Sequence, residues 1–185
     1  MSDPRPDLLA ALPDLIADRI KVSLPDLRTC KGQSGRFDVE ALKKFGLAAP
    51  AVLVATTRIS QGQTYAGPHA TFTIEMAAFV VTKDGLGLSR DAAAAQICQT
   101  LLAMLPDRTW SEPGVGPAEA VTALPLITAA QTGIASSLWA VTWRQPITFT
   151  AIPVSQPQPI ELYVGQHPNV GGANADDYTQ IGGGQ

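Results

Sequence analysis

The sequence predicts an α+β fold: helices packed on one face of a mostly antiparallel sheet, with a long β-hairpin and an extended C-terminal arm. Residues 71–83 alternate apolar and polar side chains with a period of two, which is typical of a strand with one buried face. Residues 138–151 alternate in a similar way, and residues 89–105 carry apolar side chains at helical spacing. These three stretches predict the sheet and a helix that covers it.

The first part of the chain predicts two helices separated by a loop. Residues 7–22 are amphipathic, and Pro13 either kinks this helix or lies in the first turn of a helix that begins near Leu12. We expect a short extended piece over residues 24–29 and a polar loop over residues 30–37. Asp38 then caps a short helix over residues 39–45, which Gly46 ends. The apolar stripe of the first helix consists of Leu8, Leu9, Leu12, Leu15, Ile16 and Ile20.

The central part predicts a hairpin followed by a helix. Residues 50–59 are β-branched at their centre, and the polar residues 61–68 join them as a loop to the long strand 71–83. After a turn at residues 83–87, Ser89 is a suitable N-cap and Asp91 places a negative charge in the first helical turn. Pro106 ends this helix, which we expect to cover the apolar face of the hairpin.

Two further strands follow a loop over residues 107–118. Residues 121–128 are apolar but contain Pro125, so they form an edge strand or two short pieces. A connection over residues 129–137 leads to the strand 138–151, in which Pro146 requires an edge position or a bulge. One face of that strand collects Trp139, Val141, Trp143, Ile147 and Phe149.

The chain changes character after Ile152. Residues 1–152 are expected to form a single domain, and residues 153–185 an arm rich in Pro and Gly that contains no Lys or Arg. Residues 160–164 are an apolar, strand-like island in this arm. They either add as a strand to the sheet of a neighbouring subunit or pair within their own subunit.

Composition narrows the class of protein. The net charge is −3 and the pI about 5.3, so there is no basic surface that would indicate nucleic-acid binding. Charged residues make up only 16% of the chain, which is compatible with broad contacts between subunits. There is no apolar run long enough to span a bilayer and no signal-peptide order at the N-terminus. We therefore expect a soluble protein made in a cytoplasm.

Candidate catalytic and metal-binding groups are sparse. His69 and His167 fall in predicted loops, and no cluster of His or Cys has the spacing of a zinc site. Residues 133–137 lack the spacing of a serine-hydrolase elbow, and residues 114–116 lack the context of a dinucleotide loop. Cys98 is expected to be a small core residue. The sequence therefore predicts no enzyme, cofactor or metal.

A family resemblance begins at Gly35-Arg36-Phe37-Asp38 and continues through Glu40-Ala41-Leu42 to Ala49-Pro50-Ala51-Val52-Leu53-Val54. With the order of elements from about Leu8 to Leu105, these motifs resemble the Mu-like tailed-phage neck proteins that act as tail terminators. The resemblance implies an α+β subunit without catalytic residues, located in the virion neck and assembled in the host cytoplasm.

The same resemblance implies the partners. Such subunits form a homo-oligomeric ring, typically a hexamer, on the head-proximal end of the tail tube. The ring contacts the tail tube protein on one face, stops tube polymerisation, and offers its other face to the head–tail connector protein. DNA passes through the lumen without specific binding, and the acidic pI is compatible with that.

Two segments are the candidate contacts with neighbouring subunits or rings. One is the loop between the hairpin strands, and the other is the island in the arm. The candidate residues are Gln61, Gln63, Tyr65 and His69 in the first segment, and Ile160, Leu162, Tyr163 and Val164 in the second.

Two alternative functions remain open. A head-completion or head–tail connector protein would lie on the other side of the neck, although this chain has its strongest signals in strands. A small-ligand-binding or enzymatic α+β domain would use Trp139 and Trp143 to stack a ligand, although core packing suits both residues better.

Overall fold

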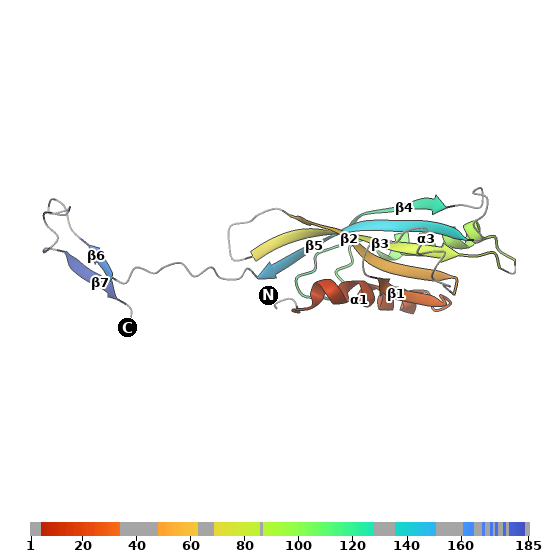
Figure 1. The fold of residues 1–185 in the computed structure, drawn as a ribbon, viewed down its shortest axis with the longest axis horizontal. Coiled ribbons are helices and arrows are strands. Elements are labelled where there is room, and N and C mark those ends of the chain that lie inside the picture. The colour runs from red at the N-terminus through yellow and green to blue at the C-terminus, as the bar shows by residue number, and fades with distance from the viewer. Residues whose placement is uncertain are drawn as a thin grey trace. The chain divides into compact units, whose positions relative to one another are not determined.

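A computed structural model describes residues 5–33, 48–62, 69–85, 87–127, 136–150, 161–164, 168, 171, 173, 176 and 178–183. The chain divides into two compact units, Met1–Ala151 and Ile152–Gln185. The first unit contains both described helices and a five-stranded sheet (Figure 1), which confirms the predicted α+β class.

The sheet has the strand order β1-β2-β3-β5-β4 and is mostly antiparallel. Its members are β1 (Thr29–Gln33), β2 (Ala51–Gln61), β3 (His69–Thr82), β4 (Glu119–Ile127) and β5 (Ser137–Thr150). β2 was predicted from its β-branched centre and β3 from alternation, and β3 pairs along its whole length with β5. Only β1, which pairs with β2, runs parallel to its neighbour.

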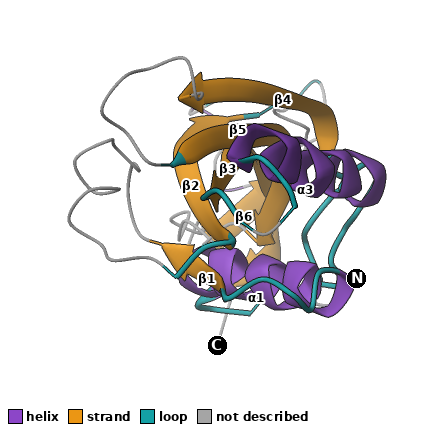
Figure 2. Cartoon of the chain, turned by 90° about the vertical axis from the view of Figure 1, so that its right-hand side faces the viewer, coloured by secondary structure: helices purple, strands orange, loops and turns teal. Residues whose placement is uncertain are grey.

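Two helices cover one face of this sheet. α1 (Leu8–Ser23) and α3 (Arg90–Met104) lie on the same side of the curved strands (Figure 2). Pro13 is buried inside α1, so the helix starts before it rather than near Leu12. At α3 the Ser89 side chain accepts a hydrogen bond from the Ala92 N–H at 3.3 Å, as expected of the predicted N-cap.

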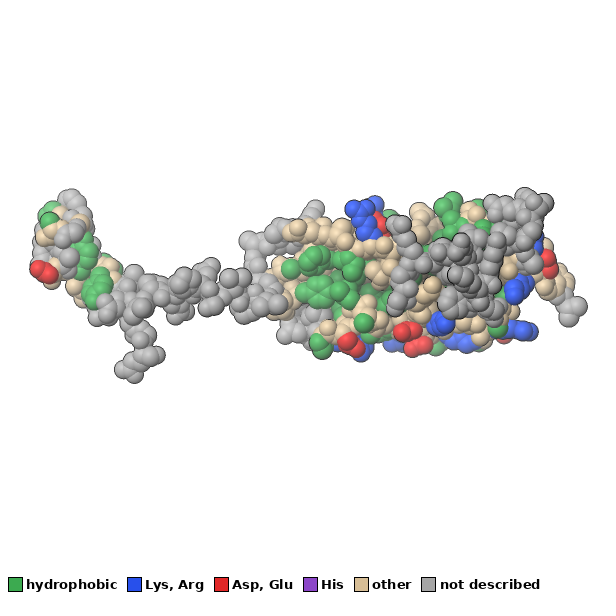
Figure 3. Space-filling view, in the orientation of Figure 1, with side chains coloured by type: hydrophobic (Ala, Val, Ile, Leu, Met, Phe, Trp, Pro, Cys, Tyr) green, Lys and Arg blue, Asp and Glu red, His purple; other side chains and the backbone are tan. Residues whose placement is uncertain are grey.

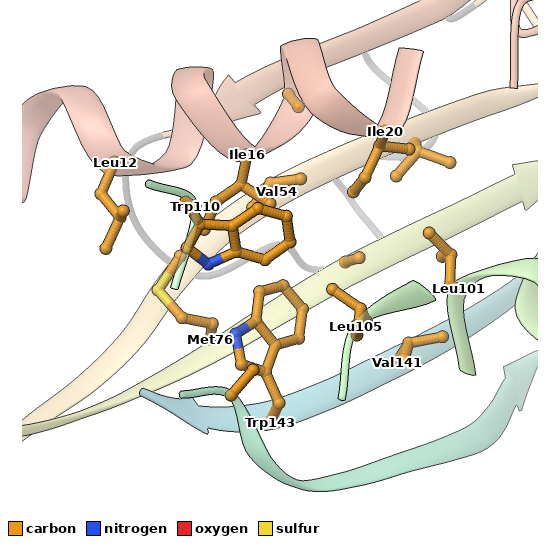
Figure 4. Packing of buried hydrophobic residues seen from close by; sticks show 14 of the residues in the cluster. Leu12, Ile16, Ile20, Val54, Met76, Leu101, Leu105, Trp110, Val141 and Trp143 are labelled. Atoms are coloured by element: carbon orange, nitrogen blue, oxygen red, sulfur yellow. The ribbon is translucent and has the colours of Figure 1, made fainter. Parts of the chain in front are cut away.

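The main core lies between the helices and the sheet. Figure 4 shows helix side chains packed on strand side chains, with Trp110 among them. Trp143 and Val141 lie on the predicted apolar face of β5. A second cluster on the other face buries Leu53, Phe79 and their neighbours, so both faces are buried at this end of the sheet. The labelled members of the main core are Leu12, Ile16, Ile20, Val54, Met76, Leu101, Leu105, Trp110, Val141 and Trp143.

The predictions for residues 24–37 were wrong in two places. Residues 24–28 form turns rather than an extended piece, and β1 occupies the start of the predicted loop. The sequence of β1 is polar and contains a glycine, so its strand conformation comes from tertiary contacts. One of these contacts is the pairing with β2. Another is a hydrogen bond to α1, in which the Gly32 N–H donates to Asp14 Oδ1 at 2.8 Å. The predicted short helix over residues 39–45 lies outside the described residues.

Pro125 of β4 and Pro146 of β5 occupy different kinds of position in the sheet. β4 is an edge strand, as Pro125 predicted, and its pairing with β5 shifts register twice. β5 is an interior strand, so the prediction that Pro146 requires an edge position or a bulge is wrong for the strand as a whole. β4 pairs with β5 only as far as Arg144, and Gly116 N–H donates to the Pro146 carbonyl at 2.8 Å. The backbone nitrogen of Pro146, which carries no N–H, therefore faces this loop and not β3. No hydrogen bond of the β3–β5 ladder is lost.

The second unit contains one described hairpin. β6 (Glu161–Val164) pairs antiparallel with β7 (Thr179–Gly183), so the island pairs within its own chain, which was one of the two readings. Strand addition to a neighbouring subunit stays a prediction. Among the described helices, none has the length and apolar character needed to cross a membrane.

Candidate functional site

The sequence-predicted contact residues fall in both units. Gln61 is the last residue of β2 and His69 the first of β3, and both are exposed at the same end of the sheet. In the second unit, Tyr163 and Val164 of β6 are 47% and 44% exposed. Leu162 lies in β6, whereas Gln63, Tyr65 and Ile160 lie outside the described residues.

We call the sheet end that carries Gln61 and His69 the distal sheet; it comprises residues 57–61 of β2, 69–75 of β3 and 144–150 of β5. Its helix-side face continues the apolar pattern of the core but is partly open to solvent. Phe72 and Phe149 are half-buried, with ring centroids 5.9 Å apart, and Ile59 is 46% exposed. Figure 3 shows hydrophobic side chains gathered at the end of the body where β3 begins and β5 ends.

A β-bulge decides which side chains of β2 face each way in the distal sheet. The register shifts between Thr56, which pairs with Met76, and Arg58, which pairs with Glu75. The Thr57 hydroxyl donates to the Glu75 carbonyl at 3.0 Å and so holds the bulged residue in place. Because of the extra residue, Arg58 faces away from the helices and Ile59 shares the face of Ile74.

The opposite face of the distal sheet carries a row of four charged side chains. Arg58 of β2, Glu75 of β3, Arg144 of β5 and Glu119 of β4 are register partners from strand to strand. We call them the charge row. Glu75 is half-buried and the other three residues are exposed, and a hollow of about 350 Å³ lies along them.

Threonine pairs flank the charge row on the same face. Thr122 and Thr142 have their hydroxyl oxygens 2.8 Å apart on one side of the row. Thr71 and Thr148 are 3.4 Å apart on the other side. Short β-branched side chains of this kind give the sheet a polar surface on both sides of the row.

Of the two tryptophans in the ligand-binding alternative, Trp143 is part of the core and Trp139 packs against it. Trp143 is 2% exposed, and its indole N–H donates to Gln145 Oε1 at 3.1 Å. Trp110 donates to the same oxygen at 3.0 Å. Trp139 is half-buried and packs against the main core. The Trp143 side chain is therefore not free to stack a ligand, in agreement with the prediction that it packs in the core.

The thiols have the wrong protonation state for nucleophiles. Burial raises the pKa of the Cys30 and Cys98 thiols to about 11, so both are protonated at neutral pH. His69 is exposed at the start of β3. Within the described ranges, no group of three or more His, Cys, Asp or Glu side chains is placed to hold a metal ion.

Comparison with known protein-family models gives no match, and a search of characterised proteins finds no relative.

Sequence reasoning found part of this surface and missed the rest. The loop position indicated Gln61 and His69 as contact residues, and their contact with another chain stays a prediction. The charge row was missed because its members are far apart in the sequence and one of them is turned outward by a bulge.

Proposed function

We propose that this protein is a structural subunit of a tailed-phage neck, which forms a ring on the head-proximal end of the tail tube and terminates it. The proposal rests on the resemblance of residues 35–54 to tail terminators. The observation that carries it furthest is the distal sheet, in which Ile59, Phe72 and Phe149 leave an apolar face partly exposed. Exposed apolar surface of this kind favours burial against another protein chain.

The protein would act by the fit of its surfaces to neighbouring proteins and not by catalysis. A ring, with six copies as the resemblance implies, would match the last ring of the tube on one face. It would present a different surface to the head–tail connector on the other, so that no further tube subunit can add. A net charge of −3 per subunit is compatible with a lumen through which DNA passes without binding.

The first experiment is electron microscopy of particles from a phage that lacks this gene. Overlong or variable tails beside DNA-filled, unjoined heads are expected if the protein terminates the tube. Tails of normal length with leaking or tailless heads would instead assign the protein to head completion. Normal infectious particles would contradict both functions and reopen the ligand-binding alternative.

Complementation of the deletion connects that result to the distal sheet. Phe72→Ser removes an aromatic side chain from its half-exposed apolar face, and we expect it to restore tail length poorly. Val22→Ser is the matched control, because Val22 is an apolar residue of α1 that is 81% exposed. Equal rescue by both variants would remove the distal sheet from the proposed contact.

A further inference from the structure

We propose that the charge row is a self-complementary contact, through which two copies of this chain associate face to face about a two-fold axis. The row reads Arg58, Glu75, Arg144, Glu119 across β2, β3, β5 and β4, so that the charges alternate in sign from strand to strand. The proposal goes beyond the terminator function and does not rest on it.

The geometry of the row makes it complementary to itself. Neighbouring strands are about 4.8 Å apart, so four strands carry the charges along a line of roughly 14 Å. A two-fold axis parallel to the strands, in the plane between the two sheets, reverses the row. Arg58 of one copy then lies opposite Glu119 of the other, and Glu75 lies opposite Arg144.

The side chains of the row are available for such a contact. In the part of the chain that the structure describes, none of the four forms an ion pair within 4.0 Å. The hollow of about 350 Å³ is lined by all four, together with Ser60, Thr73 and Pro146, and leaves room for the long side chains of an opposing copy. The threonines on either side are short side chains, so they do not hold two opposing sheets apart.

Two bulges bring the ends of the row into line. Arg58 follows the register shift of β2 at Thr57, and Glu119 precedes a shift in β4 at which Ala120 has a positive φ of 52°. A non-glycine residue in the left-handed region is uncommon and carries a conformational cost. Bulges are found where a strand must re-aim a side chain, and here they place both outer charges beside the inner pair.

Charge inversion tests the pairing across the contact. The variant Arg58→Glu, Glu75→Arg, Arg144→Glu, Glu119→Arg preserves alternation within the sheet and remains complementary to itself. Against the wild type it places like charges opposite each other at all four positions. We expect each protein to form two-fold assemblies with itself in sedimentation velocity, and differently labelled wild-type and inverted chains not to mix.

Reversal of a single charge measures how much one residue of the charge row contributes to self-association. Glu75→Arg should weaken self-association at least about tenfold, because the substitution occurs twice in each two-fold contact. Asp18→Arg makes the same charge change at an exposed position of α1 and is the matched control. Wild-type association should also weaken between 50 and 500 mM NaCl, as screening of charge pairs requires.

Three results would overturn the proposal. They are free mixing of inverted and wild-type chains, equal effects of Glu75→Arg and Asp18→Arg, and a wild type that shows no two-fold association at any salt concentration. Circular dichroism of each variant separates loss of association from loss of fold. Tail length in the gene-deletion experiment is a separate readout, so the terminator function can fail while this contact stands.

Discussion

Gln145 is a polar side chain that is fully buried in the core of β5, and its amide links two parts of the chain. Its Oε1 accepts hydrogen bonds from the indoles of Trp110 and Trp143, and its Nε2 donates to the carbonyls of Arg108 and Gly116. In addition to backbone hydrogen bonds, the loop over residues 107–118 is therefore attached to the sheet by a side chain whose hydrogen-bonding groups are satisfied.

Replacement of this amide should be costly. Gln145→Leu fills a similar volume but leaves two indole N–H groups and two carbonyls without their partner, so we expect a loss of about 3 kcal/mol in the free energy of unfolding. Urea denaturation followed by tryptophan fluorescence measures it. Gln99→Leu, at an exposed position of α3, is the control and should change stability little. A loss below about 0.5 kcal/mol for Gln145→Leu would mean that water replaces the amide.

Single residues were predicted well where the signal is local. Ser89 caps α3 as its place before a run of alanines indicated, and Trp143 is buried as the alternation of β5 indicated. Gln145 was not predicted, because a glutamine on the apolar face of a strand gives no sign of the partners that its amide will find.

At the scale of elements, β1 is a strand that depends on its surroundings. Its polar sequence forms a strand between β2 on one side and α1 on the other. Gly32 permits the close approach of α1, since a Cβ at this position would lie 2.6 Å from Asp14 Oδ1 and 2.7 Å from the Asp14 backbone nitrogen. A backbone atom of a packed helix cannot move aside cheaply.

Gly32→Ala should therefore separate α1 from β1. We expect a destabilisation of about 2 kcal/mol, measured by urea unfolding, and faster amide exchange in β1. Gly85→Ala is a matched control, because nothing lies within 4 Å of a Cβ built there. Equal stability of the two variants would show that α1 can shift without loss.

The elements differ in how far the sequence could predict them. β3 and α3 were predicted because each repeats its own period over many residues. β1 lacks a period, and the bulge at Thr57 has no sequence signal that alternation can detect. Simple alternation from Val52 and Val54 would place Arg58 on the helix side, whereas the bulge turns it outward.

At the scale of the whole molecule, the chain is two units of unequal character. The first unit has a core on both sides of a sheet, and the second has a two-stranded hairpin in which Leu162 pairs with Gly182. Two strands are marginally stable by themselves. A partner surface for the arm would explain why Tyr163 and Val164 are exposed in the isolated chain.

Removal of residues 153–185 should weaken ring or neck assembly while the first unit stays folded. We expect an unchanged urea midpoint and reduced assembly on tail tubes, seen by electron microscopy. The double variant Tyr163→Ser and Val164→Ser keeps the length of the arm and should reproduce the defect if side chains carry the contact. Normal assembly of the truncated protein would exclude a role for the arm.

The arm follows directly from the end of β5, and this connection has a mechanical consequence. A force applied along β5 through a captured arm pulls the strand lengthwise against β3, to which it is paired at fourteen positions from His69–Thr150 to Thr82–Ser137. The hydrogen bonds of that ladder are then loaded together in shear and do not open one after another like a zipper. A subunit anchored by its arm and pulled along β5 would in this way share the tension over the whole ladder.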